Sequence, residues 1–162
     1  MKYLITGLVL SLGLASSNHA NAQLAVTAQH DHQQLLRSND PHLQANKKLV
    51  YDFWREVFEA GHMELAEKYL TEDYQQHNPN VGTGRAAFVD LLSRIRKPSE
   101  IAPRIKMPLV SIIAERDLVT LVFVAQHRDP KDQSKTYTST WFDMFRIENG
   151  KIAEHWDPDT KQ

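Results

Sequence analysis

The spacing of apolar residues changes once along the chain, near Lys97-Pro98. Before this point, apolar side chains recur every three or four residues, as on one side of a helix. After it, they alternate with polar ones and β-branched residues become frequent, as in strands. Helices grouped first and strands grouped later are typical of an α+β domain rather than of alternating parallel units. The sequence therefore predicts an α+β fold with an antiparallel sheet.

Three helices are expected before this change, over residues 42–60, 63–70 and 85–96. The first begins after Asp40-Pro41, a capping side chain followed by proline, and carries one broad apolar stripe. Thr83 is the expected cap of the third helix. The segment 71–84 contains Asn-Pro and two glycines, so a loop is predicted there.

Four strands are expected after the change, over residues 104–115, 118–127, 135–147 and 151–156. Arg116-Asp117 is expected to form a tight turn and residues 129–134 a longer loop. Residues 148–150 are expected to form a hairpin turn, for which Gly150 is available to adopt a positive φ. Because hairpin follows hairpin, consecutive strands should pair in an antiparallel sheet.

The N-terminus has the pattern of a secretory signal peptide over residues 1–22: Lys2, an apolar run and a small-x-small cleavage site. The mature chain would begin at Gln23 and be periplasmic or secreted. Residues 23–41 are expected to form a flexible lead-in, and residues 42–162 a single domain. No segment reaches the roughly 20 apolar residues of a membrane-spanning helix.

Composition argues against several classes of partner and chemistry. Lys and Arg number 19 and Asp and Glu 20, and they are scattered, so no nucleic-acid surface is expected and small molecules fit better. The chain has no cysteine, which excludes disulfides and thiol catalysis. His30 and His32 lack further ligands nearby and are expected in a solvated linker, so no metal site is predicted. Residues 82–87 match G-x-G-x-x-A but follow no buried strand, and no dinucleotide or other cofactor is expected.

One carboxylate stands among large apolar side chains in the third expected strand. Alternation places Asp143 on the same face as Trp141 and Phe145. Burial of a carboxylate is costly and raises its pKa toward the range useful for proton transfer. Asp143 is therefore either an acid/base group in a pocket or a structural residue that pairs with arginine or caps a turn.

Two histidines are further candidates for the same site. His77 lies in the expected loop, where its side chain could project into a pocket, and His127 ends the second strand. Either could donate a hydrogen bond or carry a proton. The alternatives are a turn residue bonded to the backbone for His77 and an exposed strand end for His127. His62 and His155 are expected at the surface.

The segments "YQQHNP" and "GKIAEHWD" carry a resemblance to a known family, and the similarity extends over residues 45–157. The chain resembles the SnoaL-like polyketide cyclases, which have the nuclear-transport-factor-2-like fold. This resemblance implies a cone in which a curved antiparallel sheet wraps around three N-terminal helices and encloses a pocket. It also implies that Asp143 acts as general acid/base in an aldol closure, with His77 and His127 in the pocket. A homodimer formed through the sheet is the implied assembly.

Two functions from different classes follow. The first is a cofactor-free enzyme in which Asp143 abstracts a proton beside a carbonyl group and His77 and His127 stabilise the enolate, leading to aldol cyclisation, isomerisation or dehydration. The second is a non-catalytic periplasmic module that binds a small apolar ligand. The expected pocket residues are Phe53, Trp54, Trp141, Phe145 and Trp156. Convergence of Asp143, His77 and His127 in one cavity would favour the enzyme, and their separation would favour the binding module.

Overall fold

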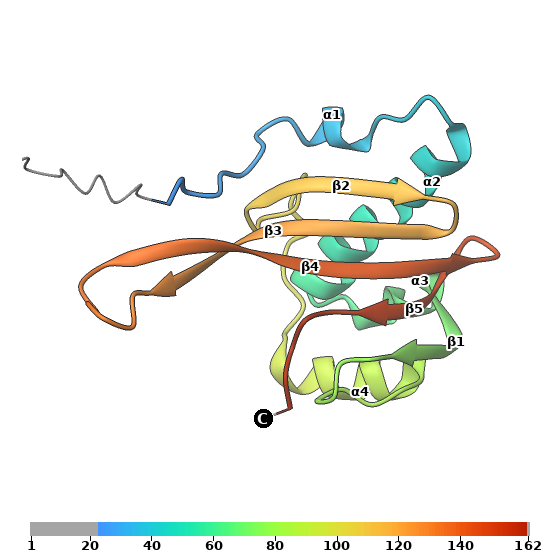
Figure 1. The fold of residues 1–162 in the computed structure, drawn as a ribbon. Coiled ribbons are helices and arrows are strands. Elements are labelled where there is room, and N and C mark those ends of the chain that lie inside the picture. Colours follow the sequence, from blue (N-terminus) through green and yellow to red (C-terminus); the bar gives the residue numbers. More distant parts are fainter. Residues whose placement is uncertain (1–22, 162) are drawn as a thin grey trace, which may run out of the picture.

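One five-stranded sheet forms the centre of the computed structural model, which describes residues 23–161 (Figure 1). Its strands are β1 (Leu70–Gln76), β2 (Leu109–Glu115), β3 (Leu118–Arg128), β4 (Thr136–Glu148) and β5 (Lys151–Trp156). The order across the sheet is β1-β5-β4-β3-β2, so β2 to β5 form the expected antiparallel series of hairpins. The α+β prediction is confirmed. The expected signal peptide, residues 1–22, lies outside the described residues.

Helices precede most of the strands, as predicted. They are α1 (His32–Leu36), α2 (Pro41–Phe53), the π-helical η1 (Trp54–Glu59), the 3-10 turn η2 (Met63–Leu65), α3 (Ala66–Tyr69) and α4 (Arg85–Ile95). Asp40 caps α2, because its Oδ1 accepts a hydrogen bond from the His42 N–H at 2.8 Å. The single helix predicted over 42–60 is therefore α2 continued by a π-helical turn. None of the helices in residues 23–161 is long and apolar enough to cross a membrane.

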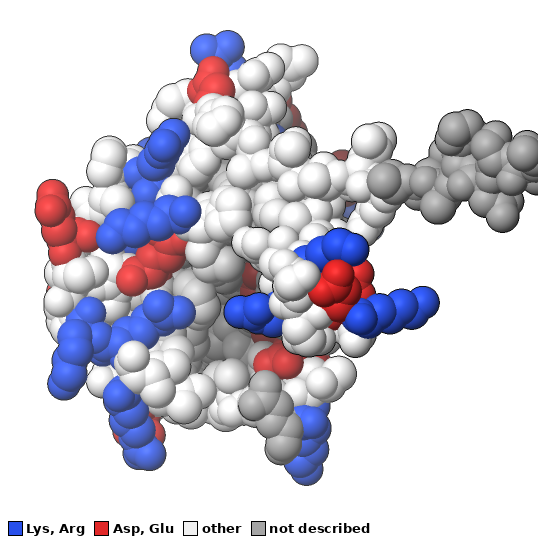
Figure 2. All heavy atoms as spheres, turned by 90° about the vertical axis from the view of Figure 1, so that its left-hand side faces the viewer, with Lys and Arg blue, Asp and Glu red and all other residues white. Residues whose placement is uncertain are grey.

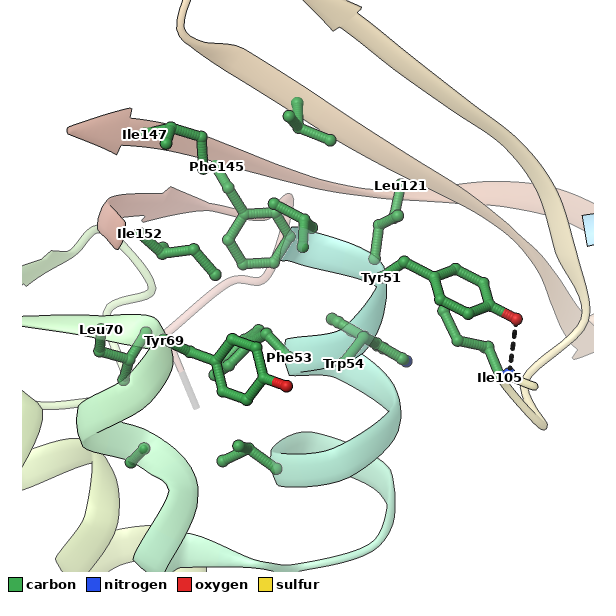
Figure 3. Close-up of a cluster of buried hydrophobic side chains, with 14 of the residues drawn as sticks. Tyr51, Phe53, Trp54, Tyr69, Leu70, Ile105, Leu121, Phe145, Ile147 and Ile152 are labelled. Carbon is green, nitrogen blue, oxygen red and sulfur yellow. Dashed lines mark hydrogen bonds between the residues drawn. The ribbon is translucent and has the colours of Figure 1, made fainter. Parts of the chain in front are cut away.

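Aromatic side chains fill the space between the sheet and the helices (Figure 3). Phe53 is central: its ring lies 6.0 Å from Phe145 of β4, 6.0 Å from Tyr69 of α3 and 5.8 Å from Phe88 of α4, measured between centroids. All four rings are buried, and full burial of a large apolar side chain stabilises a fold by about 1.5–3 kcal/mol. This packing fixes the inner face of β4 relative to α2 and α4.

Strand β1 was not predicted, because residues 71–84 were expected to be a loop. It pairs in parallel with β5, and its register shifts between Leu70 and Gln75. An edge strand buries few side chains, and here only Leu70 and Tyr74 are buried, so the apolar alternation of a strand is missing from the sequence. The predicted Thr83 cap is also wrong: Gly84 precedes α4 without a side-chain cap, and Thr83 Oγ1 instead accepts from the Gln76 N–H at 3.2 Å.

The segment before α2, expected to be a flexible lead-in, makes specific contacts with the domain. The Gln29 N–H donates to the Leu109 carbonyl at 2.8 Å, and His32 Nδ1 lies 2.8 Å from the Tyr51 hydroxyl. His32 is buried rather than solvated, because it packs edge-on against the Tyr51 ring. Its ring thus has a structural partner at the edge of the core.

Candidate functional site

A cavity of about 450 Å³ lies between the inner face of the sheet, η1 and α4. Its walls are mainly aromatic and aliphatic, with contributions from Phe53, Trp54, Phe58, Phe88, Leu92 and Trp141. Polar side chains gather on the β1, β4 and β5 side: Tyr74, Gln76, Asn78, Asp143, His155 and Asp157. Figure 2 shows the surface hollowed on this side of the molecule, next to the projecting β3–β4 hairpin. Apolar walls with a few grouped polar atoms, in a cavity within about 300–1,000 Å³, are typical of small-molecule sites.

Strand alternation directs Asp143 into this cavity. Trp141, Asp143 and Phe145 share the inner face of β4, whereas Phe142 between them is 46% exposed on the outer face. Asp143 itself is 3% exposed and lies opposite Leu121 of β3, a fully buried residue. The face predicted for Asp143 from the sequence is therefore the face it occupies.

A bulge in β5 brings His155 to Asp143. In β5, Ile152 pairs with Ile147 of β4 and Glu154 pairs with Arg146 of β4. Ala153 is therefore an extra residue with no partner in β4. Ile152 and His155 consequently both face inward although three positions separate them. His155 was expected at the surface but is only 7% exposed. The prediction was wrong because strict alternation of inward and outward residues does not allow for a bulge.

The hydrogen bonds of Gln76 determine which nitrogen of His155 carries a proton. Gln76 Oε1 accepts from the Asn78 backbone N–H at 3.0 Å, and this fixed donor orients the amide. The same oxygen lies 2.9 Å from His155 Nδ1, so Nδ1 must be the donor. His155 Nε2 lies 3.0 Å from Asp143 Oδ1, and a proton has to lie between these two atoms. The pair is either a neutral acid donating to an imidazole or an imidazolium donating to a carboxylate.

Within residues 23–161, the second oxygen of Asp143 has no hydrogen-bond partner. Oδ2 is buried and makes no hydrogen bond of normal geometry with a described residue, although the nearby Trp141 side chain lowers the pKa of Asp143 slightly. Burial raises the pKa of Asp143 above its ordinary value of 3.8, and this effect exceeds the opposing influence of the hydrogen bond from His155. A buried carboxylate oxygen that is free to accept a proton is unusual in a purely structural ion pair.

Tyr74 adds a hydroxyl group to the same cavity. Its oxygen accepts a hydrogen bond from Gln76 Nε2 at 3.1 Å, which leaves its own proton available for another acceptor. Burial, followed by the negative charges of Asp143 and Asp157, raises the pKa of Tyr74 well above its ordinary value. The phenol therefore stays protonated near neutral pH and remains a donor. Sequence reasoning missed Tyr74 because β1 was not recognised as a strand.

The structure places His77 away from Asp143. Tyr74, Gln76 and Asn78 line the cavity, and alternation directs His77 to the opposite side of the chain. There His77 Nε2 lies 2.8 Å from Glu154 Oε1, and its ring stacks on Trp156 with centroids 4.9 Å apart.

His127 and Trp156 are also outside the cavity. β2 pairs with β3 no further than Phe123, so β3 and β4 extend beyond it as a two-stranded arm that carries His127 (Figure 1). His127 is exposed and bonds Ser139 Oγ at 2.7 Å. Trp156 follows the inward-facing His155 and therefore faces outward. The other four predicted pocket residues, Phe53, Trp54, Trp141 and Phe145, all line the cavity.

Among residues 23–161, the one group with ligand atoms close enough to share a metal ion is Asp143, His155 and Asp157, whose atoms lie within 4.8 Å of one another. Both ring nitrogens of His155 already face oxygen atoms, Asp143 Oδ1 on one side and Gln76 Oε1 on the other. A metal would have to displace one of these bonds. The geometry thus fits a proton-sharing pair better than a preformed metal centre.

Comparisons with known proteins identify the fold. A family model described as a SnoaL-like domain matches residues 50–155. A candidate polyketide cyclase from Acidithiobacillus ferrooxidans is 18% identical, with 75% of this chain and 89% of that chain covered and a TM-score of 0.50. A candidate SnoaL-like polyketide cyclase from Jannaschia sp. CCS1 is 13% identical, with 75% and 91% covered and a TM-score of 0.53.

A third similar structure carries a different named activity. It is an LEH-like epoxide hydrolase from M. tuberculosis, which is 14% identical, with 72% of this chain and 84% of that chain covered and a TM-score of 0.51. At these identities the three structures establish a shared fold and leave the reaction open. No curated protein sequence matches the chain.

Proposed function

Because the chain belongs to the SnoaL-like domain family, we propose that its pocket binds a small apolar carbonyl compound and that Asp143 moves a proton at the carbon beside the carbonyl group. The observation that carries this proposal is the unpartnered Oδ2 of Asp143, a buried carboxylate oxygen in an apolar cavity. An apolar environment raises the proton affinity of a carboxylate, which makes it a better base than it is in water.

The proposed step starts from the form in which His155 Nε2–H donates to Asp143 Oδ1. The substrate C–H bond breaks, its proton goes to Oδ2, and its electron pair forms the C=C bond of an enolate. His155 keeps its hydrogen bond to Oδ1 and balances charge in the site. Aldol cyclisation, isomerisation and dehydration share this step, and it transfers no electrons to an acceptor.

Tyr74 takes the role that the sequence assigned to His77 and His127. Its hydroxyl lines the cavity and has a proton available, so it can donate to the enolate oxygen as negative charge develops there. Gln76 would act as a positioning residue, because it holds both the Tyr74 hydroxyl and the His155 ring.

Deuterium uptake tests the proposal without knowledge of the natural substrate. 1-Indanone, an apolar aromatic ketone, is incubated in D₂O with the protein, and loss of the C2 proton signal is followed by NMR. Wild type should accelerate exchange, and Asp143→Asn should lose about 10²–10⁴-fold of the acceleration. Asp90→Asn, an isosteric change at an exposed position on α4, is the control and should keep the wild-type rate.

A non-catalytic binding module remains the second candidate, since His77 and His127 lie outside the cavity that holds Asp143. Binding of 1-indanone to wild type, measured by calorimetry, without acceleration of its exchange would favour this function. Acceleration that survives in Asp143→Asn would exclude Asp143 as the base.

Export, domain boundaries and assembly belong to the same proposal. We propose that residues 1–22 are removed and that the mature chain is periplasmic or secreted, with residues 42–162 as its domain; N-terminal sequencing of the exported chain tests this.

A homodimer through the sheet is supported by Ile113 and Phe142, which are 56% and 46% exposed on its outer side. Phe142→Glu should then convert a dimer to a monomer in light scattering, and a monomeric wild type would refute it.

A further inference from the structure

Arg96 reaches the cavity from the end of α4. Phe88 and Leu92 lie on one side of α4 and line the cavity. Arg96, the extended residue that follows the last turn of the helix, lines the cavity as well. The Arg96 guanidinium lies over the Phe58 ring, 4.5 Å from its centroid. Phe58 in turn stacks on Trp54 with centroids 4.2 Å apart. A cation is therefore held in place on an aromatic wall of the pocket.

No residue among 23–161 forms an ion pair with this cation. Arg96 makes no ion pair and no side-chain hydrogen bond within residues 23–161, and its Nε atom is buried without a partner. Arg55 and Arg146, by contrast, have carboxylate partners: Arg55 contacts Asp52 and Glu56, and Arg146 contacts Glu154. A guanidinium has five N–H donors, and leaving a buried donor unsatisfied is costly. The missing partner is expected to come from a ligand.

We propose that Arg96 binds the carboxylate of the substrate, so that the pocket accepts an apolar monocarboxylate. A guanidinium offers two parallel N–H groups, which match the two oxygens of a carboxylate. A more highly charged anion fits less well, because Asp143 and Asp157 also line this pocket and would repel it. The same repulsion keeps the substrate carboxylate at Arg96 and leaves an uncharged part of the molecule for Asp143.

This inference deepens the proposed function, since it names the substrate class for the same pocket, but it makes a separate claim. Proton transfer requires Asp143 and is tested with a neutral ketone. Charge selection requires Arg96 and can be tested by binding alone. Either claim can fail while the other holds.

The test compares two ligands of the same shape, 2-naphthoate and 2-naphthamide, by isothermal titration calorimetry. Wild type should bind the naphthoate roughly ten-fold more tightly, as expected for a charged hydrogen bond. Arg96→Met keeps the aliphatic stem but removes the charge, so it should abolish this preference and leave the affinity for naphthamide within about two-fold. Arg94→Met, two residues earlier in the last turn of α4 and with a side chain 72% exposed, is the matched control and should keep the preference.

A salt titration of wild type provides a readout without any variant, should Arg96→Met fold poorly. Raising the salt concentration should weaken binding of naphthoate and leave naphthamide unchanged, because salt screens charge interactions only. Equal affinities of wild type for the two ligands, or a preference that survives in Arg96→Met, would refute the Arg96 site alone. Failure of wild type to bind either ligand would overturn both this inference and the proposed apolar pocket.

Discussion

The replacement Asp143→Asn separates a catalytic carboxylate from a structural one through its effect on stability. The two side chains have nearly the same size. Neutral His155 carries its proton on Nδ1, which donates to Gln76, so its Nε2 can accept a hydrogen bond from the Asn amide. The variant therefore keeps the hydrogen bond and loses only the charge. It also relieves the desolvation of a residue that is 3% exposed and has an unpartnered oxygen.

The size of the effect follows from two opposing contributions. A hydrogen bond to a charged group contributes about 1.5–3 kcal/mol and a neutral one about 0.5–1.5 kcal/mol, so the variant loses roughly 1 kcal/mol at His155. An unsatisfied buried charge costs more than the roughly 1–3 kcal/mol of a neutral group, and this cost is removed. The expected balance at pH 8 is a stabilisation of about 1 kcal/mol, or a rise in Tm of roughly 4 °C for a domain of this size.

The difference in stability should depend on pH with a definite sign. The pKa of Asp143 is raised in the folded state above 3.8, so the folded protein binds this proton more tightly than the unfolded chain. Wild type therefore loses stability as the pH rises from 3.8 through the folded pKa, and Asp143→Asn does not. The advantage of the variant should be close to zero near pH 4 and should grow toward pH 8.

Thermal unfolding of both proteins between pH 4 and pH 8 measures this, with Asp90→Asn as the control for an exposed charge. A variant destabilised by more than about 1 kcal/mol at pH 8 would show that the buried charge of Asp143 stabilises the folded protein. That result would mean that the charge of Asp143 holds the fold together through His155, and the catalytic assignment would fail with it.

Three further predictions concern the partner histidine, the backbone and metal ions. His155→Gln should lower indanone exchange by at least about 10²-fold, and the double variant with Asp143→Asn should be little worse than either single variant, because the two residues act as one unit; additive losses would contradict this. Gly61→Ala should destabilise the protein by roughly 2–4 kcal/mol in urea unfolding, because φ is +78° and the new Cβ would lie 2.7 Å from the Lys97 carbonyl oxygen. Gly150→Ala, at φ +75° in open space, should cost only about 1 kcal/mol, and equal losses would show that the clash is unimportant. Addition of Zn²⁺ should leave Tm unchanged within about 1 °C, because both ring nitrogens of His155 are engaged; a larger rise would point to a metal centre at Asp143, His155 and Asp157.

The pattern of the sequence determined those features that depend on neighbours along the chain. Regular alternation over β4 placed Asp143 on the buried face beside Trp141 and Phe145, and the burial of this strand follows that pattern. Asp40-Pro41 fixed the start of α2, and the long apolar stripe identified its buried side. The change of period near Lys97-Pro98 indicated the α+β class, and the segments "YQQHNP" and "GKIAEHWD" indicated the family.

Tertiary structure decided which polar side chains meet Asp143. A prediction from local pattern assumes that residues of a strand alternate without interruption between its two faces. The bulge in β5 exchanges the two faces for the residues that follow it, so His155 points inward and Trp156 outward. β1 depends on pairing with β5 rather than on its own apolar content, and only this pairing brings Tyr74 and Gln76 to the cavity and turns His77 away. The lack of a partner for Arg96 is likewise a property of the assembled pocket. Each of these outcomes depends on contacts between segments far apart in the chain, and no local periodicity records such contacts.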